Sequence, residues 1–219
     1  MELVIIGAGG FGREVLDVVR SVSRGDAVDG PSISFLGFID DGNPDTQVLT
    51  RIGATHLGGK ETLNDLAPCH FVVAVGDPSL REKLAYAAVD AGHTAAPALI
   101  HPAATVGKDV TLGAGTIICA GVRVTTNVRV GQHVHLNINA TVGHDVIIDD
   151  FASLNPLSAI SGGVRLGRGV MIGTNACVNQ GIGIDADAVV GSGAAVIRDV
   201  QRGTTVAGVP ARPLTSTPR

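Results

Sequence analysis

Residues 130–147 read VGQHVHLNINATVGHDVI, which divides into three six-residue units that each begin with an aliphatic residue. The pattern continues in both directions: every sixth position from Ile100 to Val196, 17 in all, is Val, Ile or Leu. The fifth residue of each unit is always small or β-branched. This regularity is an internal repeat, so we interpret the region as one structural unit copied along the chain.

The six-residue period predicts the architecture. Six residues supply a short strand and a turn, so three units close one triangular coil of 18 residues whose stability comes from stacked neighbours. The first-position aliphatic residues should point inward. The second position, often Gly, Asn or Asp, should adopt the left-handed backbone of a tight corner. We therefore predict a left-handed parallel β-helix over residues 98–219, with a short C-terminal tail, although its hand departs from the usual right-handed crossover.

Residues 1–97 follow a different pattern. ELVIIGAGGFGREVLDVVRSV predicts a strand, a glycine-rich turn and an amphipathic helix that begins near Gly10. SISFLGFIDD and HFVVAVGD predict two further strands, and PSLREKLAYAAVDAG predicts a helix ending near Gly92. The fold class is thus mainly β with an α/β N-terminal domain: a small Rossmann-like βαβ domain followed by the β-helix.

Composition narrows the classes of function. The net charge of -4 gives no electrostatic reason to expect nucleic acid as a partner. The three cysteines form no CxxC pair, so neither a disulfide framework nor a structural zinc site is expected. No apolar run approaches the roughly 18 residues of a membrane span. We expect a soluble cytoplasmic protein.

Gly7, Gly9 and Gly12 form a G-x-G-x-x-G motif between the first strand and helix, the context for a phosphate at a helix N-terminus. The acids Asp40 and Asp41 lie about thirty residues further on rather than about twenty, and the domain is half of a full dinucleotide fold. A nucleotide or a nucleotide-linked sugar therefore fits better than a dinucleotide. The alternative is that the glycines only allow the helix to pack on the strand.

His144 and Asp145 fall on the outward part of their unit, so they cannot belong to the core. Histidine suits general-base chemistry near neutral pH, and an adjacent carboxylate can orient it. Gly162 follows 18 residues later, so its backbone N–H should stack beside His144 and could receive a carbonyl oxygen. This arrangement favours acyl transfer, while the alternative is a solvent-exposed polar turn.

Other residue groups offer weaker candidates. His133 and His135 could join His144 in a metal trio, but their spacing does not match that of hexapeptide-repeat carbonic anhydrases, and we expect no metal. Cys177 has no histidine in its own or a stacked unit, which disfavours an acyl-cysteine route. Asn137 is ambiguous, because asparagine is also favoured at a corner for its backbone.

The whole chain resembles the sialic acid O-acetyltransferase and nucleotide-sugar N-acetyltransferase family of hexapeptide-repeat enzymes. The resemblance rests on these motifs: GAGGFGREV, FIDD, AVGDPSLREKL, LIHP, LNINATVGHD and GVPARPL. It implies a trimer with acetyl-CoA in the groove between neighbouring β-helices. It also implies that His144 is the base, supported by Asp145 and near Asn137, and that Gly162 holds the thioester carbonyl.

The resemblance further implies that the later coils hold the pantetheine arm, around Thr174, Ser192, Gly193 and Ala194. For the phosphates of CoA we add Arg198, Arg202 and Arg212 as candidates, although each could equally be surface charge. In nucleotide-sugar members the N-terminal domain binds the nucleotide, here through Gly7, Gly9, Gly10, Phe11, Asp40, Asp41, Gly76 and Asp77. Bacillosamine-type members have a histidine where this chain has Phe11, which leaves the acceptor open.

Together these observations predict an acetyl-CoA-dependent acetyltransferase that works by direct attack in a ternary complex. The expected acceptor is the amino group of a nucleotide-linked amino sugar. Two alternatives stay open: O-acetylation of a sugar or sialic acid hydroxyl, and a non-catalytic nucleotide-binding module whose β-helix serves only to form a trimer.

Overall fold

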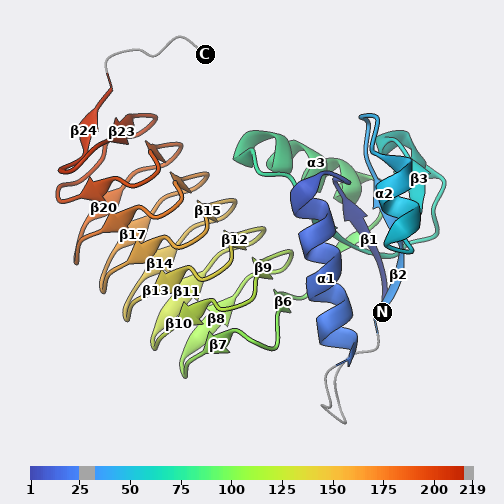
Figure 1. Cartoon of the computed structure of the whole chain (residues 1–219), viewed down its shortest axis with the longest axis horizontal. Coiled ribbons are helices and arrows are strands. Elements are labelled where there is room, and N and C mark those ends of the chain that lie inside the picture. Colours follow the sequence, from blue (N-terminus) through green and yellow to red (C-terminus); the bar gives the residue numbers. More distant parts are fainter. Residues whose placement is uncertain (25–32, 215–219) are drawn as a thin grey trace.

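The hexapeptide units form short parallel strands that stack in three sheets, which are the faces of the predicted left-handed β-helix (Figure 1). The structure is a computed structural model that describes residues 1–24 and 33–214. Equivalent residues of successive coils are 18 apart as far as β22, and 16 apart in the last coil, where Val189 pairs with Thr205. Thr141 pairs with Ala159, for example, and Ala159 pairs with Cys177. The first-position aliphatic residues fill the interior, with Leu136, Leu154 and Ile172 each fully buried.

We number the faces in the order in which the chain meets them. Face 1 contains β6 (Leu99–Ile100), β9 (Ile117–Ile118), β12 (His135–Leu136), β15 (Ser153–Leu154), β18 (Met171–Ile172), β21 (Val189–Val190), β23 (Thr205–Ala207) and the antiparallel β24 (Arg212–Pro213). Face 2 contains β7 (Thr105–Val106), β10 (Arg123–Val124), β13 (Thr141–Val142), β16 (Ala159–Ile160), β19 (Cys177–Val178) and β22 (Ala195–Val196). Face 3 contains β8 (Val110–Leu112), β11 (Val128–Val130), β14 (Ile147–Ile148), β17 (Arg165–Leu166) and β20 (Gly183–Ile184).

The corners differ from the prediction. The left-handed residues lie at the fourth position of the unit, as in Asn127, Asp145 and Gly163, and not at the second. Second-position glycines are needed for another reason, which is close approach between coils. A Cβ on Gly143 would lie 2.7 Å from the Gly162 nitrogen, and one on Gly107 would lie 2.2 Å from a carbonyl oxygen of the next coil. The expectation that the second position turns the corner was therefore wrong, because the fourth position does so, as Asp145 does in the unit that contains Gly143.

The N-terminal domain is a five-stranded parallel sheet in the order β3-β2-β1-β4-β5. Its strands are β1 (Glu2–Ile6), β2 (Ser34–Ile39), β3 (His56–Gly58), β4 (His70–Val73) and β5 (Thr94–Ala95). Its helices are α1 (Gly10–Arg24), α2 (Thr46–Arg51), the short 3-10 helix η1 (Lys60–Asn64) and α3 (Pro78–Asp90). The predicted strands and helices are present. The elements β3, β5, α2 and η1 were not predicted, because they are too short to show a periodic pattern.

Two of the motif glycines have structural reasons to be glycine. Gly7 has a φ of 108°, and a Cβ on Gly12 would lie only 2.0 Å from the Gly7 carbonyl oxygen. This close contact lets α1 pack against the end of β1, so the packing explanation considered for the motif holds at these two positions. It does not extend to the other glycines of the turn.

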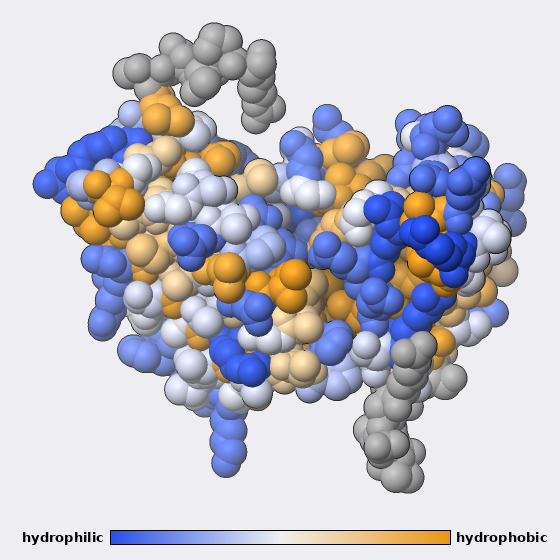
Figure 2. All heavy atoms as spheres, viewed as in Figure 1, coloured by the Kyte–Doolittle hydropathy of each residue, from blue (hydrophilic) through white to orange (hydrophobic). Residues whose placement is uncertain are grey.

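The N-terminal domain packs on face 1 of the β-helix (Figure 1). Val15 and Val18 of α1 share one buried cluster with Leu99 and Ile117 of β6 and β9. The last coils extend beyond the domain, and the surface is notched between the two parts (Figure 2). In the described part of the chain, we find no helix with the length and apolar character that crossing a membrane requires.

Candidate active site

His144 and Asp145 occupy the corner between faces 2 and 3, which we call the 2–3 corner (residues 143–146, 161–164, 179–182 and 197–199). His144 Nδ1 lies 2.6 Å from an Asp145 carboxylate oxygen, and both side chains are more than half exposed. An ionised carboxylate can only accept, so Nδ1 carries the hydrogen and the Nε2 lone pair of the neutral ring is free to take a proton. The left-handed backbone of Asp145, with φ 61°, belongs to the same corner.

Asn127 lies one coil before Asp145 and supports it. Its side-chain amide donates to the other carboxylate oxygen of Asp145 at 2.6 Å. The hydrogen bonds from His144 and Asn127 lower the pKa of Asp145, which keeps the carboxylate ionised. Asn127 was not among the predicted site residues, although it precedes Asp145 by the 18 residues that bring two side chains together in this fold.

Gly162 stacks directly on the His144 ring. A Cβ at this position would lie 2.6 Å from His144 Nε2 and Cε1, so no larger residue fits beside the ring as it is placed. The Gly163 N–H donates to the His144 carbonyl at 2.8 Å, while no acceptor for the Gly162 N–H is found among the described residues. A free donor therefore adjoins His144, and the predicted stacking of Gly162 on His144 is present.

The same corner continues toward the C-terminal coils. Residues 144, 162, 180 and 198 occupy equivalent positions, so Gln180 and Arg198 follow Gly162 in one column. With strands about 4.8 Å apart, Arg198 lies roughly 14 Å along the helix axis from His144. Arg198 and Arg212 also line one cavity of about 260 Å³ at the end of the β-helix. Arg202 is paired with Asp187 at 3.0 Å.

The remaining candidates for the pantetheine arm lie elsewhere in the protomer. Thr174, Ser192 and Gly193 are on the corner between faces 1 and 2, which we call the 1–2 corner (residues 137–140, 155–158, 173–176 and 191–194). The Ala194 side chain is fully buried inside the β-helix, so it cannot line an outer groove. The resemblance implied Ala194 only as one of a group of neighbouring residues, and its side chain takes the inward, fifth position of its unit.

Asn137 lies on the 1–2 corner, at the opposite end of β13 from His144. It is mostly buried, and its side-chain amide donates to the side-chain oxygen Oδ1 of Asn155 in the next coil at 3.2 Å. The other two histidines are also apart from His144. His135 lies under the N-terminal domain, and His133 stacks between the rings of Phe71 and Phe151. The described residues hold no group of three metal-ligating side chains.

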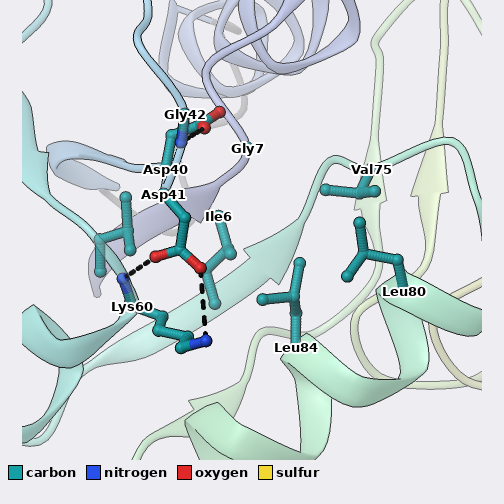
Figure 3. A pocket seen from close by; sticks show the side chains of 10 residues that line it. Ile6, Gly7, Asp40, Asp41, Gly42, Lys60, Val75, Leu80 and Leu84 are labelled. Atoms are coloured by element: carbon teal, nitrogen blue, oxygen red, sulfur yellow. Dashed lines mark hydrogen bonds and ion pairs between the residues drawn. The ribbon is translucent and has the colours of Figure 1, made fainter.

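A second site lies at the carboxyl ends of β1, β2 and β4, where ligands bind in open parallel sheets. It is a cavity of about 230 Å³ (Figure 3). Asp41 and Lys60 face each other on one side at 3.6 Å, and Val75, Leu80 and Leu84 form an apolar wall on the other. The cavity thus combines a polar edge with a surface on which a flat ring can lie.

Asp40 connects this cavity to the glycine turn. One of its oxygens accepts from the Ala8 N–H at 2.6 Å and the other from the Gly42 N–H at 2.8 Å. Gly9, Gly10 and Gly76 have open space where a Cβ would be, and none has a left-handed φ. Neither packing nor backbone explains glycine at these three positions, whereas a ligand close to the backbone would.

Two predicted nucleotide-binding residues have other contacts. The Phe11 ring is 4.8 Å from the His135 ring, so it belongs to the interface between the domains. Asp77 caps α3, where its carboxylate accepts from the Leu80 N–H at 2.8 Å and from the Ser79 hydroxyl at 2.7 Å. These contacts give both residues a structural role in the protein without a ligand.

A hexapeptide β-helix with a histidine–aspartate pair on one corner, joined to a small parallel-sheet domain, defines the class of hexapeptide-repeat acyltransferases. Residues 2–87 match the PglD N-terminal domain family. The chain is 30% identical over 166 residues to a GDP-perosamine N-acetyltransferase of Escherichia coli O157:H7, covering 72% of this chain and 69% of the relative. The chain therefore belongs to the nucleotide-sugar N-acetyltransferase family and is an acetyltransferase.

Solved structures agree over nearly the whole chain. PerB from Caulobacter crescentus, in complex with CoA and GDP-perosamine, is 31% identical with a TM-score of 0.87, and 98% of each chain is covered. The acetyltransferase domain of PglB from Neisseria gonorrhoeae FA1090, in complex with acetyl coenzyme A, is 29% identical with a TM-score of 0.82, covering 97% of this chain and 98% of that one. The family resemblance and the predicted fold are confirmed.

Proposed function

We propose that this protein transfers the acetyl group of acetyl-CoA to the amino group of a nucleotide-linked amino sugar. The observation that carries the proposal is the Asn127–Asp145–His144 chain of hydrogen bonds, which ends beside the free N–H of Gly162. The relatives support both substrates, since one structure holds CoA with GDP-perosamine and another holds acetyl coenzyme A.

The chemistry follows from the protonation states of these groups. When bound, acetyl-CoA supplies a thioester carbonyl, which is open to attack by an uncharged amine. His144 Nε2 takes a proton from the attacking nitrogen, and the ionised Asp145 stabilises the imidazolium that forms. The Gly162 N–H adjoins His144 and has no acceptor among the described residues, so it suits the role of oxyanion donor where the carbonyl oxygen gains negative charge. His144 then returns the proton to the departing sulfur.

We assign the acetyl-CoA site to the residues that follow His144 along the 2–3 corner. Gly162, Gln180 and Arg198 continue from His144 along the 2–3 corner, and the cationic end of the column suits the phosphates of CoA. Arg212 lines the same terminal cavity as Arg198 and adds a second cation. Thr174, Ser192 and Gly193 could serve only from a neighbouring copy whose 1–2 corner faces this column.

The acceptor site fits the cavity of the N-terminal domain. The open backbone at Gly9 and Gly10 begins α1, so its free N–H groups and helix dipole suit a diphosphate. Asp40 and Asp41 suit sugar hydroxyl groups, and the apolar wall of Leu80 and Leu84 suits the base.

These two sites lie on different sides of one protomer. The N-terminal domain covers face 1, whereas His144 lies on the corner between the other two faces of the triangle. A nucleotide sugar held by one copy would therefore reach the His144 of another. This geometry supports a homotrimer with an active site at each contact between copies.

Replacing His144 with Ala tests the proposed chemistry. Turnover of acetyl-CoA with a GDP-linked amino sugar should fall about 10²–10⁴-fold, because the general base is lost. The thermal midpoint should still rise with acetyl-CoA, because the donor column is intact. A variant as active as the unchanged protein would refute the role of His144.

A mixing experiment tests the shared site. Gly10→Leu should block the nucleotide while causing no clash, because the position is open. Trimers assembled from equal amounts of inactive Gly10→Leu and inactive His144→Ala chains should recover about a quarter of full activity, since half of the pockets and half of the bases are intact. No recovery in confirmed mixed trimers would place both residues in the same protomer's site.

A further inference from the structure

Arg81 is an unusual residue of the interface between the domains. It lies on α3 and is fully buried, which is rare for arginine unless its hydrogen bonds are satisfied. No feature of the proposed reaction requires it to contact either substrate. Burial lowers its pKa to about 9, while the nearby Asp77 carboxylate acts in the opposite direction, so the guanidinium is still charged at neutral pH.

The two terminal nitrogens of Arg81 bind different parts of the protein. Nη1 donates to the Val75 carbonyl at 2.9 Å and to the Gly76 carbonyl at 3.4 Å, both in the loop after β4. Val75 itself lines the acceptor cavity (Figure 3). This half of the guanidinium therefore holds the backbone of the loop on which the nucleotide would rest.

The other terminal nitrogen of Arg81, Nη2, donates hydrogen bonds to the β-helix. Nη2 donates to the Phe151 carbonyl, to the Ala152 carbonyl at 3.3 Å and to the Ser153 hydroxyl at 2.9 Å. These residues end the coil that contains His144. Because a guanidinium is planar and rigid, its two nitrogens fix both the distance and the angle between the groups that they bind.

His135 completes the connection. Its Nδ1 lies 2.8 Å from Arg81 Nη1, which can only donate, so Nδ1 accepts and Nε2 carries the hydrogen. Nε2 then donates to the Val73 carbonyl at 2.9 Å, at the end of β4. Burial and the Arg81 charge lower the pKa of His135, so the neutral ring that this arrangement needs is the stable form.

We infer that Arg81 is a positioning residue that fixes the nucleotide-binding loop relative to the catalytic coil. The inference rests on the proposed function. Copies would associate through their β-helices, so the placement of each N-terminal domain on its own β-helix sets where its bound sugar meets the neighbour's His144. An error of about 1 Å in such a placement can lower the rate about 10²-fold.

Arg168 provides the matched control. It also joins the two domains, donating to Glu82 and to the Tyr86 hydroxyl of α3, but its side chain is partly exposed and it contacts neither the cavity loop nor His135. A residue that only ties the domains together should behave like Arg168. A residue that positions the acceptor should not.

The experiment compares Arg81→Lys, Arg81→Met and Arg168→Met in steady-state acetyl transfer to a GDP-linked amino sugar. Lysine keeps the charge but cannot bind both domains in a fixed plane. We expect kcat to fall about tenfold in Arg81→Lys and about 10²-fold in Arg81→Met. The KM for acetyl-CoA should stay within about threefold of the unchanged protein, and Arg168→Met should keep full kcat.

Ser153→Ala keeps the test decisive if the Arg81 variants do not fold. It removes one acceptor of Nη2 without changing charge, and we expect kcat to fall about fivefold with no change in the KM for acetyl-CoA. An unchanged kcat in folded Arg81→Lys or Ser153→Ala, or an equal loss in Arg168→Met, would overturn the inference. Absence of transfer by the unchanged protein would instead refute the proposed function.

Discussion

Gly162→Ala tests the proposed role of His144 directly, because it adds one methyl group against the His144 ring. The added Cβ would lie 2.6 Å from His144 Nε2. Ordinary contacts between carbon atoms are about 3.5 Å, so the ring must move by about 0.9 Å. The backbone N–H of residue 162 is retained, so any loss of rate reports the position of the base and not the loss of the oxyanion donor.

The expected loss follows from that displacement. A misplacement of about 1 Å lowers the rate about 10²-fold, or about 2.7 kcal/mol in the barrier. The fold should tolerate the change, because the His144 side chain is more than half exposed and can swing outward. Swinging outward would break the 2.6 Å hydrogen bond to Asp145, which accounts for the loss of activity without loss of structure.

The assay is release of free CoA thiol at saturating substrates, with the thermal midpoint measured in parallel. Gly183→Ala is the matched control: it lies on β20 of the same β-helix, has no left-handed φ, and its added Cβ would meet only Asp199 at 3.7 Å. The control should keep full kcat. If Gly162→Ala also keeps kcat within about threefold, the placement of His144 beside Gly162 has no catalytic meaning and our reasoning is wrong.

Three further predictions concern charge and pH. Asp145→Asn keeps a hydrogen-bond acceptor but removes the charge that stabilises the imidazolium, so kcat should fall about tenfold or more at pH 7, as rates from CoA release will show. Arg198→Ala should raise the KM for acetyl-CoA about tenfold, and the increase should be smaller in high salt. Arg202→Ala should raise this KM less, because the Arg202 side chain is already paired with Asp187. Burial and the Arg81 charge lower the pKa of His133 to about 4. As the pH drops from 6.5 to 4, His133 is protonated in the unfolded chain before it is protonated in the folded protein. The free energy of unfolding should therefore fall by about 3 kcal/mol over this range. Urea denaturation should show a smaller fall for His133→Asn, and an equal fall would contradict this origin.

The acceptor cavity shows what sequence reasoning can and cannot reach. The motif predicted a phosphate-binding turn, and Gly7 and Gly12 proved to be required by the backbone and by helix packing. Gly9 and Gly10 have no such requirement, which is the stronger reason to expect a ligand. That distinction depends on the space around each Cα, and a sequence does not contain it.

The sequence by itself determined the β-helix and the contacts at the centre of the candidate active site. A strict period of six places residues 18 apart in contact, so the stacking of Gly162 on His144 follows from their spacing alone. The same rule would have found Asn127. Short-range periodicity is sufficient here because each coil contacts mainly its nearest neighbours.

Only the tertiary structure decided how the two domains are joined. Arg81, His135 and Ser153 come from three distant parts of the chain, and no period or motif relates them. The physical reason is that burial and domain packing depend on which surfaces meet in three dimensions, whereas the repeat fixes only the contacts between one coil and the next.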